Sequence, residues 1–568
     1  MRETFFHILR YKFRAFLKST FEWKWVSIVR GLGSLLVFGG FSIGAYALSF
    51  AVTKFLLGNV QVGLYVFHRF LSMMFFTLFI AVNLGNIIVS YSTLYRSAEV
   101  NFLFTKPVPY AQVFVLKFLD NFLYSSATLF LVTFTALLGY GSYLNYPWYA
   151  YVVVMAFVLV PFMFLAACLA VLILMAIMKL AGRIGFRQVM ALLAGFYVVL
   201  IALFFRYSNP VRLIEFVNQV GPGFADQLRF FEPTFLSYLP SHWAANILFS
   251  FARGEVARAF LQTGGLLFAT AAAFGVVLVI GSAFYYRSWL VSMHVAARSN
   301  DPAHLNRIRK FDFRKVSALP RQLEVLLKRE YFMFFREPSQ WIHLIVMVVL
   351  TMVFALSVGN LNLRLRVTEI QLLTYLVLFA FAGFLSCSVA LRFLFPMSSL
   401  EGNVFWVIRS APIETWKVYL IKLILGFILV LVLAQVVAVV TNVPFAKFSG
   451  RRPMLLWFGI YSAWWVALAA SSINLGLGTY FVNYAEKNPI RLASTQGATL
   501  TFLFTLFLLL VIVAIVILPL NEYFLTLFTF KPFKMNVIVA PGTVLAVLSM
   551  LITVLGIQVG LKSMQRDF

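Results

Sequence analysis

The sequence predicts an all-α protein: a polytopic transmembrane helical bundle of about twelve spans in two related six-span halves. Hydrophobic residues make up 62% of the 568 residues, charged residues make up 11%, and the mean hydropathy is +0.92. A soluble domain carries about 25% charged residues, so this chain has too little charge to cover a water-facing surface. The apolar residues also occur in blocks of about 20, the length that a helix needs to cross a bilayer. A soluble globular class is therefore excluded.

Reading along the chain for such blocks places the spans in order. The first half holds spans near 32–56, 64–90, 113–139, 149–178, 188–205 and 264–285. The second half holds spans near 342–359, 370–394, 417–440, 453–479, 497–519 and 539–561. The chain is thereby divided into an N-terminal amphipathic interfacial helix, a first half, a basic cytoplasmic linker and a second half, at 1–30, 31–290, 291–325 and 326–568.

The basic residues predict the orientation of the spans. The formal net charge is +27, and the N-terminal tail, the connection at 179–187 and the segment at 286–341 are rich in Lys and Arg. The connections at 57–63 and 140–148 carry no charge, whereas 441–452 is basic and runs against the trend. Because basic connections remain in the cytoplasm, we expect both termini there, in a multi-pass protein of the inner (cytoplasmic) membrane. No separate basic domain exists, so nucleic acid is not an expected partner.

The N-terminal tail has the pattern of an amphipathic helix. Apolar residues share one helical face and basic residues line another: Phe6, Leu9, Phe13, Phe16 and Leu17 against Arg10, Arg14 and Lys18. A basic amphipathic helix with aromatic residues beside a span is typical of the membrane interface. The long outer segment at 206–262 mixes charges with aromatic residues, which predicts interfacial or re-entrant helices.

One segment occurs twice, each time after the second span of a half. The first copy, "SAEVNFLFTKPVPYAQVFVLKFL", starts at Ser97, and the second, "LEGNVFWVIRSAPIETWKVYLIKLIL", starts at Leu400. At an offset of 305 residues the copies align two pairs, Pro107 with Pro412 and Lys117 with Lys422. With three residues inserted they align two more, Glu99 with Glu401 and Asn101 with Asn403. This correspondence predicts an internal repeat.

Each copy predicts a short helix, a proline break and a second helix that enters a span. Proline disfavours helix in the residue before it and lacks an N–H, so Pro107, Pro109 and Pro412 change the chain direction sharply. An acidic residue near the start of the short helix, Glu99 or Glu401, complements its positive end. Such a rigid cytoplasmic element can transmit a displacement to two spans, or it can simply be a well-formed turn.

The second copy, "EGNVFWVIRSAPIETWKVYLIKLIL", closely resembles a segment of permease (membrane-spanning) subunits of the ABC type-2 exporter family. "KREYFMFFREPSQW" at 328–341 is similar to the family's opening, a basic interfacial helix before an Arg-acid-Pro turn. The first half departs from this pattern, because "FLKSTFEW" stands in place of the turn.

The resemblance implies that the short helices couple to cytoplasmic ATPase subunits, two of them, on separate chains that bind ATP and Mg. It assigns this coupling role to eight residues: Glu99, Asn101, Pro107, Lys117, Glu401, Arg409, Pro412 and Lys422. The sequence agrees with a separate ATPase, because it contains no G-x-x-x-x-G-K-[ST] phosphate loop. On this chain itself we expect no catalytic residue, no cofactor and no metal.

The chemistry that is missing bears on the rival functions. The middles of the spans hold essentially no charged residue, so ion- or proton-coupled transport lacks its usual carriers. We interpret four polar residues there as interhelical hydrogen-bond partners: Asn83, Asn86, Gln435 and Asn474. A membrane-embedded transferase needs a carboxylate near the surface, and the first outer connection, "LLGNVQVG", has none. An uncoupled scaffold or channel subunit remains the other alternative.

The prediction is thus a permease subunit of an ATP-driven exporter. The chain contains 64 Phe residues and few fixed charges in its spans. Apolar, aromatic walls favour a lipid-like or amphiphilic cargo.

Overall fold

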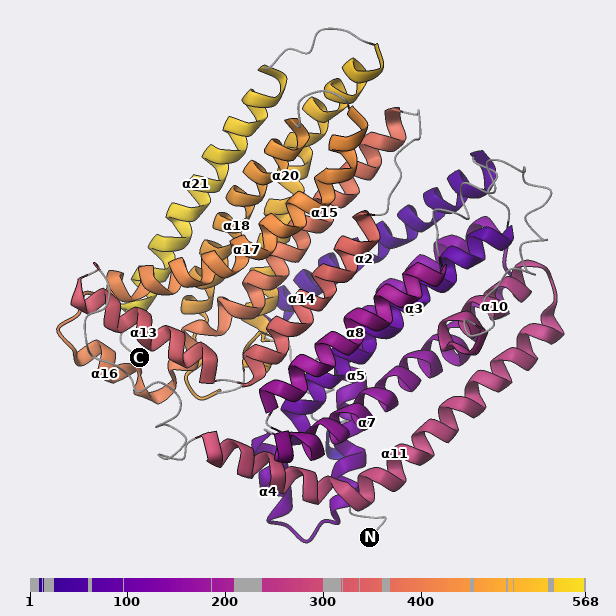
Figure 1. Cartoon of the computed structure of the whole chain (residues 1–568), viewed down its shortest axis with the longest axis horizontal. Helices are drawn as coiled ribbons and strands as arrows, with labels where there is room; N and C mark the ends of the chain where they lie inside the picture. The colour runs from indigo at the N-terminus through magenta and orange to yellow at the C-terminus, as the bar shows by residue number, and fades with distance from the viewer. Residues whose placement is uncertain are drawn as a thin grey trace. The chain divides into compact units, whose positions relative to one another are not determined.

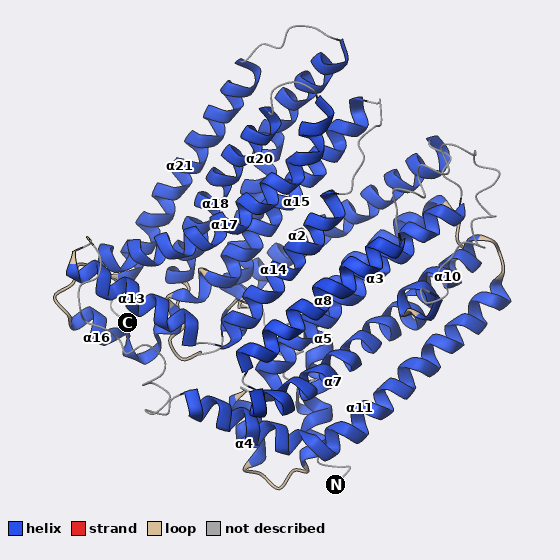
Figure 2. Cartoon of the chain, viewed as in Figure 1, coloured by secondary structure: helices blue, strands red, loops and turns tan. Residues whose placement is uncertain are grey.

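The computed structural model describes residues 10–12, 14, 25–59, 64–95, 97–184, 186–208, 237–299, 318, 320–336, 338–359, 368–449, 454–486, 489–493, 495–529 and 536–565. Every regular element in these residues is a helix (Figure 2). The chain divides into two compact units, a first unit of residues 1–301 and a second unit of residues 302–568.

The helices of the first unit follow one another with short breaks. In chain order they are α2 (Trp25–Lys54), η1 (Phe55–Asn59), α3 (Leu64–Ser90), η2 (Tyr91–Tyr95), α4 (Ala98–Phe104), α5 (Tyr110–Tyr143), α6 (Trp148–Val153), η3 (Val154–Leu159), α7 (Val160–Ile184), α8 (Phe186–Ser208), α10 (Pro240–Ala252) and α11 (Val256–Ser299). Within this unit α4 lies at one end of the bundle and α10 at the other (Figure 1).

The second unit is also a bundle of long helices with short helices at one end. In chain order they are α13 (Arg321–Arg336), α14 (Pro338–Gly359), α15 (Thr368–Phe393), η6 (Phe395–Met397), η7 (Ser399–Val404), α16 (Phe405–Ser410), α17 (Thr415–Ser449), α18 (Met454–Tyr480), α19 (Pro489–Leu492), α20 (Gln496–Thr529) and α21 (Asn536–Met564). Within this unit α13 and α16 lie at the end of the bundle where the chain terminates (Figure 1).

The helices confirm a polytopic all-α class. Among the described residues, nine helices are long and apolar enough to cross a membrane, and α5 makes a tenth if its bent halves count as one span. α8 and α14 are helices at the two remaining predicted positions, but they do not meet this test; the apolar part of α8, Ala191–Phe204, is short. Nine to ten candidate spans are therefore established.

Several helices differ from their predicted limits. α5 is bent by 47° between Tyr110–Ala127 and Leu129–Tyr143. α11 has 44 residues, so at a rise of about 1.5 Å per residue it is roughly twice as long as the hydrocarbon core is thick. An apolar run locates the part of a helix that crosses the membrane, but a helix ends only where its backbone hydrogen bonding ends. For that reason α11 runs well beyond the predicted span of 264–285.

Three predicted segments lie largely outside the described residues. They are most of the N-terminal amphipathic helix, the part of the long outer segment at 209–236, and the linker residues 301–317. The rest of the outer segment contains α10, whose side chains are mostly buried against α3 and α11.

Hydrogen bonds between buried aromatic residues attach α10 to the first unit. The Tyr146 hydroxyl donates to the carbonyl oxygen of Leu248 on α10 at 2.5 Å, and its oxygen lies 3.2 Å from that of the Tyr140 hydroxyl. Tyr140 in turn lies 2.6 Å from the Nε2 of His68 on α3. Since an unpaired polar group is costly away from water, this chain of bonds fixes α10 across the ends of α3 and α5.

Three of the four predicted interhelical polar residues do connect helices. Asn83 on α3 donates to the carbonyl oxygen of Ala166 on α7 at 2.8 Å, and Asn86 donates to Ser126 on α5 at 3.4 Å. Gln435 on α17 donates to the carbonyl oxygen of Ile460 on α18 at 3.0 Å.

For Asn474 the prediction is wrong. Its amide donates to the carbonyl oxygen of Ala470 on its own helix at 2.7 Å, and its Oδ1 has no partner in the described structure. Its helix, α18, packs closely on its neighbours through small residues, and the Asn474 amide turns back along its own helix.

Glycines bring α18 and α21 into close contact. A methyl group built on Gly476 would lie 2.4 Å from the carbonyl oxygen of Gly556, and one built on Gly556 would lie 2.7 Å from the carbonyl oxygen of Ser472. Backbones approach this closely only where side chains are absent, as is common between membrane helices. These glycines therefore set the distance between the two helices.

We predict that Gly476→Ala lowers the stability of the second unit by about 1–3 kcal/mol, because the added methyl group overpacks the α18–α21 contact. Thermal unfolding of the purified full chain in detergent measures this loss. Gly275→Ala on α11 is the matched control, since a methyl group there meets nothing within 4 Å. Equal unfolding temperatures for the two variants would contradict the close-packing account.

Candidate functional site

The first short helix, α4, stands between two long helices. It begins after Ser97 and ends at Phe104, and α5 begins at Tyr110. The turn between them contains Pro107 and Pro109, and Pro109 is the N-cap of α5. The predicted order of short helix, proline break and second helix is confirmed in this segment.

Aromatic side chains hold α4 against the extended end of α11. The Phe104 ring contacts Trp289 edge to face at a centroid distance of 4.9 Å and Tyr285 at 5.7 Å. Tyr110, at the start of α5, stacks on Tyr286 at 4.4 Å. The part of α11 just past the predicted span therefore supports the short helix.

A cluster of charged residues attaches α4 to α5 and to the N-terminal tail. Glu99, in the first turn of α4, accepts a hydrogen bond from Lys117 of α5 at 2.5 Å and lies 3.0 Å from the amine of Lys12. Lys12 also bonds to Asp120, one helical turn after Lys117. The cluster contains two cations and two carboxylates, so its formal charge is zero. We call these four residues the first charge cluster.

The second short helix, α16, begins at Phe405 and ends at Ser410. Sequence alignment predicts Glu401 near the start of this helix, where it would complement the helix dipole; this is wrong. Glu401 lies in the preceding turn, η7, and Gly402 then takes a left-handed conformation with φ of 60°, which interrupts the helix. Glycine adopts this conformation without steric cost, which explains its position here.

The Glu401 carboxylate is instead bound by cations from two other helices. Arg329 of α13 donates to it through both terminal guanidinium nitrogens, Nη1 and Nη2. The hydrogen bond from Nη1 is 3.0 Å long. Lys422 of α17 lies 2.5 Å from Glu401 and 2.9 Å from Glu330. The side chains of Glu401 and Lys422 are both 0% exposed. We call Arg329, Glu330, Glu401 and Lys422 the second charge cluster.

The two clusters use the same components with different burial. In each cluster two cations bind one glutamate next to the short helix. One cation comes from the segment before the first predicted span of that half, and the other is a lysine at the start of the third, on α5 or α17. In the first cluster most side chains are about one-third exposed, whereas the second is closed off except for Arg329. A buried charge is tolerated only when it is paired, so the second cluster is the more rigid of the two.

The pKa values of groups outside the spans agree with this pairing. Partial burial disfavours the charged form of Glu99, but hydrogen bonds and attraction from Lys117 and Lys12 outweigh it and lower the pKa of the carboxyl below its usual 4.5. Burial likewise works against the charged form of Arg329, yet Glu401 and Glu330 hold its pKa above the usual value. Both groups are therefore ionised at neutral pH.

Exposed apolar residues cover the outer side of the short helices. On and beside α16, Val404, Trp406 and Val407 are exposed, and Trp406 is 68% exposed. Phe405 points the other way, is buried, and stacks on Tyr484 at 5.4 Å. On α4, the side chain of Phe102 is likewise exposed, at 59%. We call the exposed residues the short-helix surfaces.

The predicted site residues are divided between clusters and surfaces. Four of them, Glu99, Lys117, Glu401 and Lys422, form the centres of the two charge clusters. The others lie on exposed turns or helices: Asn101, Pro107, Arg409 and Pro412. Arg409 donates to the carbonyl oxygen of Gln565 at the end of α21, at 3.3 Å.

Sequence reasoning missed the partners of these residues, Lys12, Asp120, Arg329 and Glu330. A signal for two of them exists in the chain. Asp120 follows Lys117 by one turn of the same helix, and Glu330 lies directly after Arg329 in a basic amphipathic helix. A carboxylate beside cations at the end of a span points to a specific pairing.

Apolar helices joined by short charged connections, with charge clusters beside two short helices, define a multi-pass membrane protein. A model of the family described as "Putative ATP-binding cassette" (ABC_tran_2) matches residues 26–567. The chain belongs to this family, as a membrane component of an ABC transporter. No curated protein and no solved structure matches it significantly.

We predict that Lys422→Met destabilises the second unit by about 3–5 kcal/mol, because two buried carboxylates then share one cation. The double variant Lys422→Met/Glu330→Gln keeps the cluster neutral and should recover most of this loss. Thermal unfolding in detergent measures both. In the first cluster, where Lys12 is 30% exposed, the change Lys12→Met should cost less than about 1 kcal/mol. Equal losses for Lys422→Met and the double variant would contradict the charge-balance account.

We also predict a pH dependence from Glu99. Its pKa in the folded protein is below 4.5, so its ion pairs stabilise the fold above about pH 4.5 and are lost as the pH falls through the folded pKa. The difference in unfolding temperature between the wild type and Glu99→Gln should be constant above this pH and shrink below it. Glu255→Gln, which breaks an exposed pair with Arg258, is the control and should show little difference throughout. A Glu99→Gln difference that grows on acidification would contradict the assignment.

Proposed function

We propose that this chain is the permease subunit of an ATP-driven exporter of the ABC type-2 class. In this proposal two ATPase subunits on separate chains, which bind ATP and Mg, dock on the short helices α4 and α16. The chain itself performs no catalysis. Both termini and both short helices face the cytosol, and the protein resides in the inner (cytoplasmic) membrane.

The observation that carries the proposal is the exposed apolar surface of the short helices. α16 lies outside the candidate spans, yet Val404, Trp406 and Val407 are exposed on and beside it, with Arg409 next to them. Large apolar side chains gathered at the end of a bundle and bordered by a cation are typical of a protein-binding surface. On α4, Phe102 is exposed with the Lys106 amine 4.9 Å from its ring centroid.

The charge clusters support a mechanical role for these surfaces. Glu401 is held by α13 and by α17, so α16 cannot shift without displacing an interfacial helix and the start of a span. Glu99 makes the equivalent connections to Lys12 and Lys117. Closure of the ATPase subunits on ATP would therefore move spans in both units. Sub-ångström changes at such a contact are passed on because packed helices deform little.

The same features support two related six-span halves. The clusters have matching components in each unit, and the chain divides into units of similar size. α8 and α14 would be the eleventh and twelfth spans, added to the ten candidates. A pseudo-two-fold arrangement of such halves is a common plan for transporters.

A lipid-like or amphiphilic cargo fits the spans best. Away from the ends of the spans, buried polar groups include amides that connect helices, as for Asn83 and Gln435. An ionic cargo would need charged residues along its path. Movement of a cargo with a large apolar part needs no such residues.

The test is ATPase stimulation in proteoliposomes with a stand-alone ABC ATPase subunit of the same organism. We expect the two to copurify and the permease to raise ATP hydrolysis. Trp406→Ser should weaken ATPase binding about thirtyfold, since truncating a central interface tryptophan costs about 2 kcal/mol or more. Arg409→Glu should reduce stimulation while membrane insertion is unchanged. Glu401 is unsuitable for this test, because it is buried and its replacement disturbs the fold.

Trp457→Ser is the matched control for Trp406→Ser. Trp457 is a similarly exposed tryptophan, on α18. The control should leave ATPase binding and stimulation intact. An uncoupled scaffold or channel subunit would show no stimulation in any variant, and this result would overturn the proposal.

A further inference from the structure

The two short-helix surfaces differ in the apolar area that they present. On and beside α16 three large apolar side chains are exposed, those of Val404, Trp406 and Val407. Among the described side chains of α4, Phe102 is the one large apolar residue exposed to the same degree. Apolar contact is a main source of binding energy between proteins, so the larger patch favours tighter binding at α16.

The two surfaces also differ in residue type. Tryptophan is the residue that most often dominates the energy of a protein interface, because it combines a large ring system with a hydrogen-bond donor. A partner that receives Trp406 needs a deep apolar cavity and an acceptor for the indole N–H. Phe102, with the Lys106 amine 4.9 Å from its ring centroid, has no polar atom in its side chain and needs only an apolar patch.

α16 is held firmly behind its exposed side. Phe405 is buried and stacks on Tyr484 at 5.4 Å, and Arg409 donates to the carbonyl oxygen of Gln565 at 3.3 Å. The neighbouring carboxylate of Glu401 is fully buried and is bound from α13 and α17. A surface that is already ordered loses little conformational entropy on binding, so more of its contact energy appears as affinity.

α4 is held less tightly. The side chains of Glu99, Lys12 and Asp120 in its charge cluster are each about one-third exposed, and Lys12 comes from the N-terminal tail. Water screens such pairs and reduces what they contribute to order. A partner that binds α4 must therefore supply part of the ordering itself, which lowers its affinity for this surface.

Charge does not separate the two surfaces. An exposed cation borders each of them, Arg409 at α16 and Lys106 at α4. Such cations fit a partner site with carboxylates at its rim, and they mainly set the orientation and the rate of association. The difference in affinity therefore comes from the apolar residues and from the order of the helices that carry them.

We propose that the two docking sites for ATPase subunits are unequal. One subunit binds α16 first and tightly, through an apolar cavity that receives Trp406 and a carboxylate that pairs with Arg409. A second, identical subunit then binds α4 more weakly, and the occupancy of α4 limits ATP-driven closure. This inference rests on the proposed coupling function. Two halves joined in one chain have different sequences, so nothing requires their docking sites to be equal.

The test is a titration of the full chain in lipid nanodiscs with the same stand-alone ATPase subunit. Nucleotide is left out, so that closure on ATP does not link the two binding steps, and native mass spectrometry counts the bound subunits. We expect complexes with one subunit at low concentration. Complexes with two subunits should need a concentration about thirtyfold higher, the ratio that one dominant interface tryptophan produces.

Two matched variants assign the binding steps to the two surfaces. Trp406→Ser should abolish the tight step, so that both subunits bind only in the weaker concentration range. Phe102→Ser should leave the tight step unchanged and weaken the second step about fivefold, since a peripheral aromatic residue contributes about 1 kcal/mol. Trp457→Ser, on α18, should change neither step. Thermal unfolding should show that all three variants are folded, because each replaced side chain is exposed.

The outcomes separate this inference from the function on which it rests. Two binding steps of equal affinity in the wild type, or equal effects of Trp406→Ser and Phe102→Ser, would overturn unequal docking and leave the coupling function standing. A tight first step that survives in Trp406→Ser would also overturn it, with the membrane interface as the place of this indole. Absence of any bound subunit on the wild type would overturn the coupling function itself, and unequal docking with it.

Discussion

The buried carboxylate of Glu401 is the constraint on which the second unit depends. A charge inside a low-dielectric bundle must be paired and fully hydrogen-bonded, or it is very costly. Glu401 meets this requirement only because α13 supplies Arg329 and α17 supplies Lys422. Glu330 then balances the second cation. Three segments of the chain must meet at one point, and their meeting fixes α13, the turn before α16 and the start of α17 relative to each other.

The first unit meets the same requirement with less burial. Its cluster has the same formal charge of zero, but Glu99, Lys12 and Asp120 are each roughly one-third exposed. Water screens these charges, so the pairing contributes less and tolerates more movement. Aromatic packing of Phe104 and Tyr110 against α11 also helps to hold α4, in addition to these weaker ion pairs. The two short helices are thus anchored by different balances of charge and packing, which makes α16 the stiffer of the two.

The sequence predicted the class and the helix positions because long apolar blocks have no other stable arrangement in a membrane. Four residues singled out by the internal repeat, Glu99, Lys117, Glu401 and Lys422, all lie in the charge clusters. The sequence did not predict their partners, because Lys12 and Arg329 lie about 90 and 70 residues away and pairing over such separations leaves no local pattern. It also misplaced Glu401 at the start of the short helix, whereas Gly402, with its positive φ, separates Glu401 from α16.

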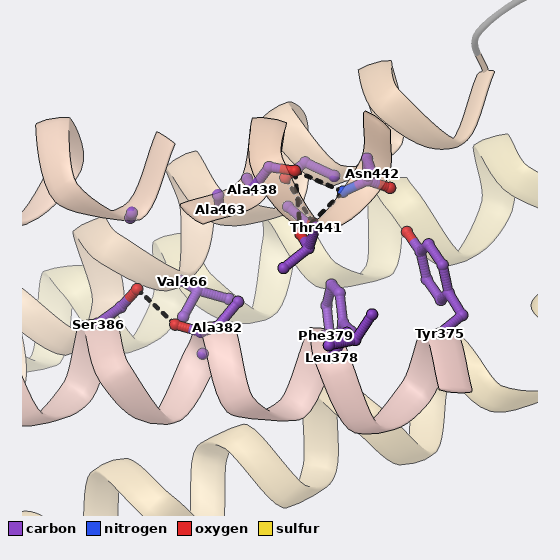
Figure 3. A pocket seen from close by; sticks show the side chains of 14 residues that line it. Tyr375, Leu378, Phe379, Ala382, Ser386, Ala438, Thr441, Asn442, Ala463 and Val466 are labelled. Carbon is purple, nitrogen blue, oxygen red and sulfur yellow. Dashed lines mark hydrogen bonds between the residues drawn. The ribbon is translucent and has the colours of Figure 1, made fainter. Parts of the chain in front are cut away.

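Polar residues within the spans separate into two groups by what satisfies them. Asn83 and Gln435 reach a backbone carbonyl on a neighbouring helix, and such bonds fix how helices pack. The Tyr375 hydroxyl and the Asn442 Oδ1 have no hydrogen-bond partner in the described chain, and both residues line a cavity between α15, α17 and α18 (Figure 3). A bundle that needed these two only for packing would be more stable with Phe and Leu in their places, since an unsatisfied buried donor or acceptor is costly. The cavity has room for water, and a bound water would supply the missing hydrogen bonds. The second unit then combines a rigid charged anchor beside its short helix with a small cavity inside its bundle.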